Sequence, residues 1–422
     1  MNLTIEKLVF GGQGLARHDG KVYFVWNALP GEEVEVEIVK ESKNFSEAVA
    51  TKIIKKSPHR LVPTEDHFLS CSAWQIMDFE SENEWKKITA KEVYQKFSGL
   101  TLDDSLEIVS DEKSQINYRN KMEYHFIESD GEIKFAFFER GGAFLVPLEG
   151  SCFLANKEIE KAGKFILAWL NGIKAPVKAL KTLILRFDGE KVLAGLVIRE
   201  KIKFASMPEI GDDLAGLHIF FADPQKPSNW LPNKLKFVGK EFLTAKINNR
   251  NLNYGLLSFF QVNENIFYQA LEDISNFVDE DSQIVDFYSG VGTIGLGINK
   301  KIKSGVLVEV NPEAVKFAKE NITKNKIKNF KAVCAQAEKA LEYITKDKTI
   351  IFDPVRAGLH PNIIKKVLEE KPGKIIYLSC DPATQARDLK QLSAIYSVKF
   401  FKLYNFFPRT PHIEALVVLE LK

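Results

Sequence analysis

Cys380 is the residue whose setting most clearly suggests chemistry. It stands where an apolar run, residues 374–379, gives way to the turn-forming pair Asp381-Pro382. A thiol at the end of a strand can act as a nucleophile, whereas an isolated cysteine is more often buried and inert. The adjacent turn and the expected strand end favour the nucleophile for Cys380. Cys334 has no such setting, and we expect it to be buried and inert.

A glycine-rich segment follows a second apolar run, residues 283–287. Gly290, Gly292 and Gly295 fit the pattern G-x-G-x-x-G between an expected strand and an expected helix, where glycines let the backbone approach a ligand. Glu309 ends the next apolar run, where an acid can accept hydrogen bonds from both hydroxyls of a ribose. The pattern predicts a site for a dinucleotide or for S-adenosylmethionine, and these residues alone do not separate the two.

Two further acids stand beside apolar runs. Asp353 begins the segment D-P-V-R-A-G-L, and its carboxylate can accept hydrogen bonds from a ligand while Pro354 fixes the backbone. The alternative is that Asp353 caps a helix that begins near Pro361. Glu414 ends the segment F-P-R-T-P-H-I-E, and with His412 it is a candidate for proton transfer. The alternative is a loop acid without a chemical role.

The order of apolar runs predicts how these residues are positioned. From about residue 245 onward, strand-like and helix-like segments alternate, which is typical of a parallel sheet covered by helices on both faces. Ligands of such sheets bind at the carboxyl ends of the strands. We therefore expect the chemistry at that edge of the sheet.

The preceding residues have a different pattern. Short strands broken by glycine turns fill the first sixty residues and suggest a small β-barrel. Residues 80–97 form an amphipathic helix pattern, and hairpin-like runs at residues 121–138 and 182–198 indicate an antiparallel middle domain. A basic cluster contains Lys52, Lys55, Lys56 and Arg60. It is interpreted as a solvated face or as a surface for nucleic-acid phosphates.

Composition limits the class of protein. A chain of 422 residues, 45% hydrophobic and 27% charged, is expected to fold into two or three globular domains. Its apolar runs are too short for a membrane helix, and Glu6 and Lys7 interrupt the N-terminus, so we expect a cytoplasmic protein without membrane contact. The net charge of +2 neither requires nor excludes a nucleic-acid partner.

Taken together and in order, the four segments resemble the motifs of the RNA uracil-5-methyltransferases: D-F-Y-S-G-V-G-T, D-P-V-R-A-G-L, Y-L-S-C-D-P-A-T and F-P-R-T-P-H-I-E. Residues 10–20 resemble the start of the family's TRAM domain, residues 118–122 a stretch of its central domain, and residues 260–263 the entry into its catalytic domain. The resemblance covers nearly the whole chain.

The resemblance implies an α/β fold of three parts. Residues 1–57 would form a TRAM-like RNA-binding β-barrel. Residues 58–76 and 108–243 would form a central, mainly antiparallel α+β domain that binds RNA. Residues 77–107 and 244–422 would form a Rossmann-like class I methyltransferase domain.

The resemblance also implies roles for single residues. Cys380 would be the nucleophile that adds to the uracil ring, and Glu414 the general base. The residues implied around the cofactor S-adenosylmethionine are Gln261, Tyr288, Gly290, Gly292, Glu309 and Asp353. Asp353 and Gln261 would also bind the target base.

One part of the pattern is broken. Many relatives hold an iron-sulfur cluster by a C-x5-C-x2-C run and a later fourth cysteine, whereas the matching positions here are Glu65, Cys71, Trp74 and Cys152. Two thiolates cannot reproduce a four-thiolate site. We therefore expect no cluster and no other metal, with Cys71 and Cys152 close in space as packed thiols.

The expected function is methylation of C5 of one uridine in RNA, with 23S ribosomal RNA as the first candidate substrate and the T loop of transfer RNA as the second. We expect a monomer. Two alternatives belong to other classes: an NAD-dependent Rossmann oxidoreductase, supported only by the glycine segment and Glu309, and a catalytically silent RNA-binding protein. The oxidoreductase leaves Cys380 unexplained, and the intact motifs count against a silent protein.

Overall fold

The computed structural model describes residues 1–140, 144–150, 152–226 and 232–422. The chain forms two compact units. Unit 1 comprises Met1–Lys7, Gln13–Asp78 and Gln115–Leu243, and unit 2 comprises Leu8–Gly12, Phe79–Ser114 and Thr244–Lys422. Each unit is described by itself, and the three-part domain division given above stays a prediction.

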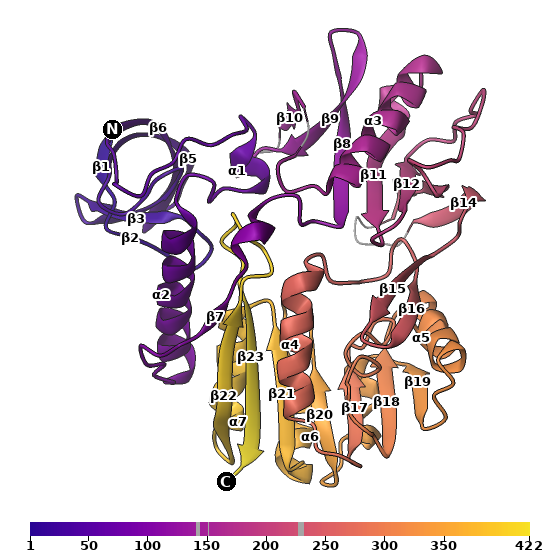
Figure 1. Ribbon diagram of the computed structural model, residues 1–422. Helices are drawn as coiled ribbons and strands as arrows, with labels where there is room; N and C mark the ends of the chain where they lie inside the picture. Colours follow the sequence, from indigo (N-terminus) through magenta and orange to yellow (C-terminus); the bar gives the residue numbers. More distant parts are fainter. Residues whose placement is uncertain (141–143, 151, 227–231) are drawn as a thin grey trace. The chain divides into compact units, whose positions relative to one another are not determined.

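The first sheet of the chain has six strands in the order β1-β5-β6-β4-β3-β2 (Figure 1). Their bounds are β1 Asn2–Thr4, β2 Lys7–Leu8, β3 Gly14–His18, β4 Lys21–Trp26, β5 Glu33–Glu41 and β6 Phe45–Lys55. In β5 the side chains of Val34 and Val36 are buried, while Glu33, Glu35 and Glu37, which alternate with them, are exposed. This alternation is expected for a sheet that has one face in the core and the other exposed to solvent.

The second sheet of unit 1 has the strand order β10-β9-β8-β11-β12-β13-β14. The bounds are β8 Lys121–Ser129, β9 Glu132–Phe138, β10 Leu145–Pro147, β11 Leu180–Phe187, β12 Val192–Ile198, β13 Gly216–Phe221 and β14 Asn233–Gly239. Among the strand pairs that the described residues form in this sheet, only β12 with β13 is parallel. Helix α3 (Lys157–Gly172) packs its apolar side chains into the core of this sheet. Unit 1 also contains α1 (Phe68–Cys71) and η2 (Val177–Ala179).

The sheet of unit 2 has the order β19-β18-β17-β20-β21-β23-β22-β7. The bounds are β7 Ile108–Val109, β17 Gln283–Phe287, β18 Ser304–Glu309, β19 Phe330–Cys334, β20 Lys348–Phe352, β21 Lys374–Ser379, β22 Tyr396–Tyr404 and β23 Glu414–Leu421. The strands from β19 to β21 are parallel, and β23 runs antiparallel to both β21 and β22. A separate hairpin pairs β15 (Leu243–Ile247) with β16 (Arg250–Tyr254).

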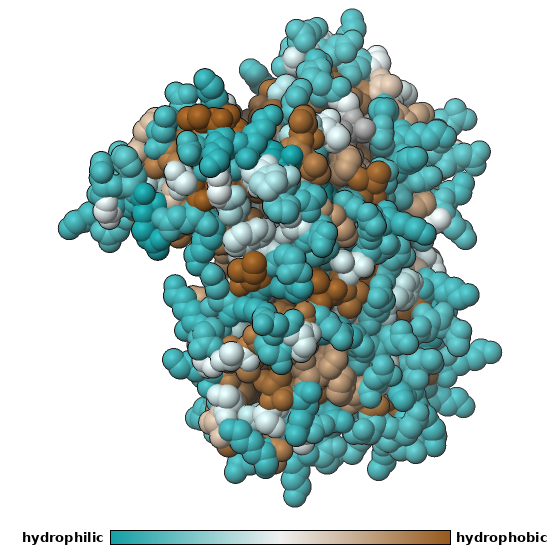
Figure 2. Space-filling view, turned by 60° about the vertical axis from the view of Figure 1, so that its left-hand side comes forward, coloured by the Kyte–Doolittle hydropathy of each residue, from teal (hydrophilic) through white to brown (hydrophobic). Residues whose placement is uncertain are grey.

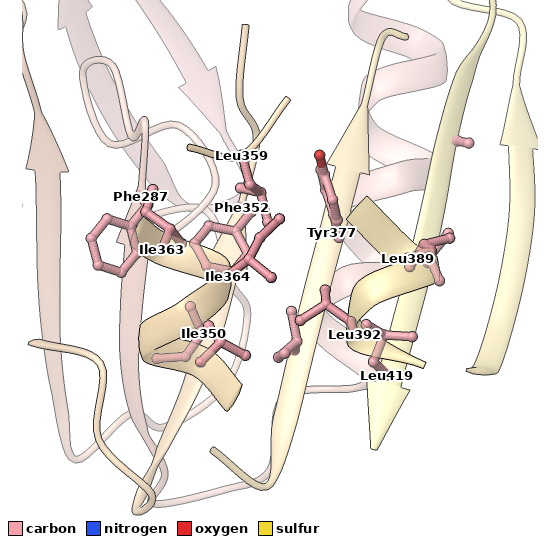
Figure 3. Close-up of a cluster of buried hydrophobic side chains, with 14 of the residues drawn as sticks. Phe287, Ile350, Phe352, Leu359, Ile363, Ile364, Tyr377, Leu389, Leu392 and Leu419 are labelled. Carbon is pink, nitrogen blue, oxygen red and sulfur yellow. The ribbon is translucent and has the colours of Figure 1, made fainter. Parts of the chain in front are cut away.

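Helices cover both faces of this sheet, with α4 in front of it and α6 and α7 behind it in Figure 1. The helices of unit 2 are α2 Phe79–Ser98, α4 Glu264–Asn276, α5 Pro312–Lys324, α6 Pro361–Glu370 and α7 Pro382–Leu392, with short 3-10 turns at η1 Glu112–Gln115, η3 Ala337–Lys339 and η4 Leu341–Tyr343. Figure 3 shows Ile350 and Phe352 of β20 facing Ile363 and Ile364 of α6 within one apolar core.

Four details of the sequence analysis are corrected. Residues 290–297 form successive turns instead of a helix, because Gly290 and Gly292 adopt positive φ angles of 56° and 92°. Cys334 is exposed, since it ends the edge strand β19. Asp353 does not cap α6, whose N-cap is His360.

The fourth correction concerns the basic cluster. Arg60 is largely buried, and its guanidinium donates to both carboxylate oxygens of the buried Glu32, at 2.5 and 2.8 Å. Lys52, Lys55 and Lys56 are exposed. Arg60 therefore ties the turn before β5 to the segment after the first sheet, and the three lysines of this cluster face solvent.

No helix within the described part of the chain combines the length and the apolar character needed to cross a bilayer. On the face shown in Figure 2, hydrophilic side chains dominate and apolar atoms appear in scattered groups.

Candidate functional site

Four parallel strands of unit 2 end at one edge of the sheet and bring the predicted residues there. Tyr288 follows β17, Glu309 ends β18, Asp353 follows β20 and Cys380 follows β21. Glu414 begins β23, which is antiparallel to β21 with Ala415 opposite Ser379. The first residue of β23 therefore lies next to the end of β21, and the acid reaches the same edge as the thiol.

The turn after β17 shapes a small recess. Its lining includes Gln261, Tyr288, Gly290 and Asp353, all predicted site residues, and also Asp286. Gln261 is positioned by its neighbour Phe260, whose ring stacks on that of Tyr254 at a centroid distance of 4.3 Å. The recess thus joins the ends of β17 and β20 with the segment that leads into α4.

Glu309 and Gly292 do not line this recess; they shape the loop around it. The Glu309 carboxylate accepts hydrogen bonds from the backbone N–H of Gly290 at 3.0 Å and of Asn311 at 2.7 Å. A Cβ on Gly292 would lie 2.8 Å from the Leu296 side chain and would also require strain at φ 92°. Glycine at position 292 is therefore needed for the turn itself.

Asp286 is a candidate that the sequence analysis missed. It is fully buried, its Oδ2 accepts from the N–H of Gly295 at 2.8 Å, and its Oδ1 has no hydrogen-bond partner among the described residues. Burial raises the pKa of Asp286 to about 8. An acid at the end of a buried strand was the available signal, and its unsatisfied oxygen is suited to a hydrogen-bond donor of a ligand.

Cys380 lies in a second pocket, lined by residues of unit 2. The lining includes Arg356, Asp381 and His412, together with Phe10 and Gly11. Burial, together with the charges of the Glu414 and Asp353 carboxyl groups, raises the pKa of Cys380 to about 12, and Arg356 opposes this shift. Arg356 is thus the cation that favours the thiolate, a role that the sequence analysis did not assign.

Both acids beside Cys380 also hold their protons more strongly than usual. Burial raises the pKa of Asp353 to about 7. Glu414 is buried, and burial together with the charge of Asp353 raises its pKa well above the ordinary value. A thiol between two acids that have elevated pKa values is an arrangement suited to coupled proton transfers.

The turn after Cys380 and the adjoining strands are held by buried hydrogen bonds. Asp381 caps α7, since its Oδ1 accepts from the N–H groups of Ala383 and Thr384, both at 3.0 Å. Gln385 donates to the carbonyl groups of Tyr377 on β21 and Ala415 on β23, at 2.9 and 3.2 Å. Asp381 is therefore a structural residue, and Gln385 fixes the spacing between the strands that carry Cys380 and Glu414.

The loop before Glu414 is anchored by an ion pair on α2. Glu82 and Lys86 are completely buried, with their charged atoms 2.8 Å apart. Lys86 donates to the carbonyl of Phe407 at 3.2 Å, and Glu82 accepts from the N–H of Arg409 at 3.0 Å. The helix pattern at residues 80–97 gave no hint of this role, because a charged pair on a helix is usually solvated.

Known proteins are similar to this chain in sequence and in fold. The sequence model of the tRNA (Uracil-5-)-methyltransferase family matches residues 233–422, and that of the TRAM domain matches residues 1–51. An uncharacterized RNA methyltransferase of Aquifex aeolicus is 30% identical over 100% of this chain and 99% of its own. One from Fusobacterium nucleatum is 28% identical over 100% of this chain and 96% of its own.

A solved structure extends the similarity to the fold. The Pyrococcus abyssi tRNA (uracil-54, C5)-methyltransferase in complex with S-adenosyl-L-homocysteine is 25% identical, with a TM-score of 0.80 over 99% of this chain and 100% of that chain. The fold class expected from the sequence is thereby confirmed.

The fold and the strand-end site define a Rossmann-like RNA methyltransferase. The chain belongs to the tRNA (uracil-5-)-methyltransferase family and carries an N-terminal TRAM domain. The family inferred from four short segments is confirmed. The methyltransferase interpretation of the glycine segment is accordingly preferred to the dinucleotide interpretation.

Proposed function

We propose that this chain transfers the methyl group of S-adenosylmethionine to C5 of a uridine in RNA, with Cys380 as covalent nucleophile and Glu414 as general base. The observation that carries the proposal is the pairing of β21 with β23, which sets Glu414 beside Cys380 at the edge where Asp353 follows β20. Neither a dinucleotide enzyme nor a silent RNA-binding protein needs this combination of thiol and acids.

The residues that line the recess beside the glycine turn are suited to contact the cofactor. The lining offers the Tyr288 ring, the backbone of Gly290 and the buried Asp286 oxygen that lacks a partner among the described residues. S-adenosylmethionine supplies an electrophilic methyl group on a sulfonium. Glu309 supports the turn instead of lining the recess, because its carboxylate accepts a hydrogen bond from the N–H of Gly290.

The first step is addition of the Cys380 thiolate to C6 of uracil. A bond forms between sulfur and C6, and the electrons of the C5–C6 double bond move to the O4 enolate. Arg356 favours the thiolate, and Asp353 and Gln261 would hold the polar edge of the base. C5 is then nucleophilic enough to take the methyl group: the bond between C5 and the methyl carbon forms, the methyl–sulfonium bond breaks, and S-adenosylhomocysteine is the leaving group.

The second step restores the ring. The Glu414 carboxylate removes the proton from C5, the C5–C6 double bond re-forms, and the bond between C6 and sulfur breaks to release Cys380 as thiolate. The pKa of Glu414 is raised, which makes its carboxylate a stronger base and suits it to accept the proton from C5.

A covalent adduct tests the mechanism. RNA that carries 5-fluorouridine at the target keeps a fluorine that Glu414 cannot remove, so we expect a complex with the full chain that survives denaturation. The same RNA with Cys380→Ala should form none. If the wild-type chain methylates ordinary RNA but forms no adduct with the 5-fluorouridine RNA, covalent catalysis is contradicted.

We propose 23S ribosomal RNA as the substrate and the T loop of transfer RNA as the second candidate. Exposed Lys52, Lys55 and Lys56 on and after β6 are suited to RNA phosphates. The similarity to the Pyrococcus abyssi enzyme along the whole chain favours the second candidate. Mass spectrometry of both RNAs from a strain that lacks this gene decides between them, because 5-methyluridine should disappear from one and remain in the other.

We further propose that the chain acts as a monomer in the cytoplasm. Sedimentation of the purified chain, alone and with RNA, tests the stoichiometry: a species of twice the mass of one chain would contradict it.

A further inference from the structure

A second cluster of chemically competent side chains lies in unit 1, which contains none of the proposed catalytic residues. Glu65, His67, Cys71 and Cys152 each offer one ligand atom, and these four atoms all lie within 4.8 Å of one another. Three of the residues come from the short segment around α1, and Cys152 comes from the loop before α3. Two distant parts of the chain thus converge on one point.

The cluster is buried, and one of its nitrogen atoms is unsatisfied. The side chains of His67 and Glu65 are only 7% and 9% exposed, and Cys152 is 1% exposed. Nε2 of His67 lies 3.4 Å from Oε1 of Glu65 and has no hydrogen-bond partner among the described residues. A buried polar atom without a partner is unfavourable, so a ligand bound to this nitrogen would stabilise the structure.

Neighbouring groups hold the Glu65 carboxylate in place. Its Oε2 accepts from Nε2 of Gln75 at 2.8 Å, and its Oε1 accepts from the backbone N–H of Phe153. Oε1 of Gln75 in turn accepts from the N–H of Thr64 at 3.1 Å. Metal-binding carboxylates are usually oriented by outer hydrogen bonds of this kind.

An iron-sulfur cluster does not fit these residues. Such clusters are held mainly by thiolates, and only Cys71 and Cys152 supply them here. The position that the resemblance gives to a third cysteine holds Trp74, which is 2% exposed and fills the space with an indole ring. His67, by contrast, lies at none of the positions of the resemblance.

We propose that Glu65, His67, Cys71 and Cys152 bind a single Zn²⁺ ion in a tetrahedral site. Zinc accepts this mixture of sulfur, nitrogen and oxygen ligands, at about 2.3 Å to sulfur and about 2.0–2.2 Å to the others. Those bond lengths place the ligand atoms roughly 3.3–3.8 Å apart, so the cluster needs only a small contraction from its present spacing. The ion would satisfy Nε2 of His67.

The proposed ion has a structural role. Four protein ligands leave no open position for a substrate, which is the pattern of a structural zinc site. The ion would tie the segment around α1 to the loop before α3. This proposal departs from the expectation of packed thiols without a metal, and it does not depend on the proposed reaction.

Metal content and cobalt spectroscopy of the full chain test the proposal. We expect one equivalent of zinc after purification. Replacement by Co²⁺ should give the visible bands of a tetrahedral site and a thiolate charge-transfer band. A chain that contains neither metal, and that gives no such spectrum with one equivalent of Co²⁺, would overturn the site. So would a brown protein with near-stoichiometric iron after anaerobic purification.

Variants identify the ligands. Cys152→Ala leaves Cys71 as the one thiolate of the site, so it should reduce the charge-transfer band and weaken Co²⁺ binding more than about 100-fold, while Gln75→Ala, which only loosens Glu65, should weaken it about tenfold. Cys334→Ser removes an exposed thiol outside the cluster and should change neither Co²⁺ binding nor the spectrum.

If Cys152→Ala does not fold, chelation of the wild-type chain provides the second measurement. A fall in Tm that added Zn²⁺ reverses supports the site, and an unchanged Tm after complete zinc removal contradicts it.

Discussion

Cys380 and the pair formed by Cys71 and Cys152 place thiols in two different kinds of environment. Around Cys380 the neighbours are acids with raised pKa values and one cation, Arg356, beside a pocket. Around Cys71 and Cys152 the neighbours are a histidine and a carboxylate whose ligand atoms converge within 4.8 Å. Convergent donors favour a bound ion, whereas a thiol beside an open pocket is available to a substrate. The contrast shows that the burial of a cysteine alone does not indicate its chemistry. More is indicated by whether neighbouring ligand atoms converge on the thiol or leave it facing a pocket.

The largest effect should come from Cys380→Ala. Loss of the nucleophile is expected to reduce methyl transfer to RNA at least about 10⁴-fold, measured with radiolabelled S-adenosylmethionine. The zinc content should stay the same, since the two thiol regions belong to different units. Cys334→Ser is the matched control and should keep full activity. Substantial turnover by Cys380→Ala would show that Cys380 is not the nucleophile, so that the proposed chemical difference between the two regions would no longer hold.

Glu414→Gln should have the next largest effect. Without a base the adduct forms but cannot resolve, so turnover should fall roughly 10³-fold, while a covalent complex accumulates on ordinary RNA. Glu420→Gln changes a more exposed acid on the same strand and should be nearly neutral. Gel analysis of the complex under denaturing conditions gives the result, and wild-type turnover by Glu414→Gln would exclude it as the base.

Glu82→Gln tests how much the buried ion pair between Glu82 and Lys86, which anchors the loop before Glu414, contributes to stability. The change leaves Lys86 buried without its carboxylate, which should lower the free energy of unfolding by about 3–5 kcal/mol, measured by urea denaturation. The control is Glu80→Gln, which lies on the same helix but is exposed. Zinc binding should not change. Equal stability of the two variants would show that the pair contributes nothing.

The smallest effect concerns pH. Because the pKa of Cys380 is raised to about 12, its thiolate fraction increases with pH throughout the neutral range. Adduct formation with 5-fluorouridine RNA should therefore accelerate about tenfold per pH unit. Arg356→Gln removes the favourable cation and should slow the reaction roughly tenfold at a fixed pH, whereas Arg356→Lys should retain most of the rate. A rate independent of pH would mean that RNA binding itself sets the thiolate population.

Much of the fold could be predicted because strand position and chemistry coincide. Apolar runs that end in Asp353 and Cys380 mark the carboxyl ends of β20 and β21, and the family's motifs occur in the order expected. The placement of Glu414 needed tertiary information, since only the antiparallel insertion of β23 brings it to β21.

Other features depend on partners that are distant in the sequence. The burial of Arg60 follows from Glu32, and that of Lys86 from Glu82 and the loop before Glu414. His67 was overlooked because its significance lies in its approach to Cys152, more than eighty residues away in the chain. Local patterns identify elements, but they do not identify which charged side chains will find a buried partner.

The insertion of β23 between β21 and β22 has a consequence for timing. The ribosome completes Cys380 well before Glu414, yet β22 and β7 join the sheet only through β23. The nucleophile and the base can therefore meet only after β23 has been synthesised and inserted. Competence to modify RNA would then arise in a single event, when β1 to β22 have already been synthesised.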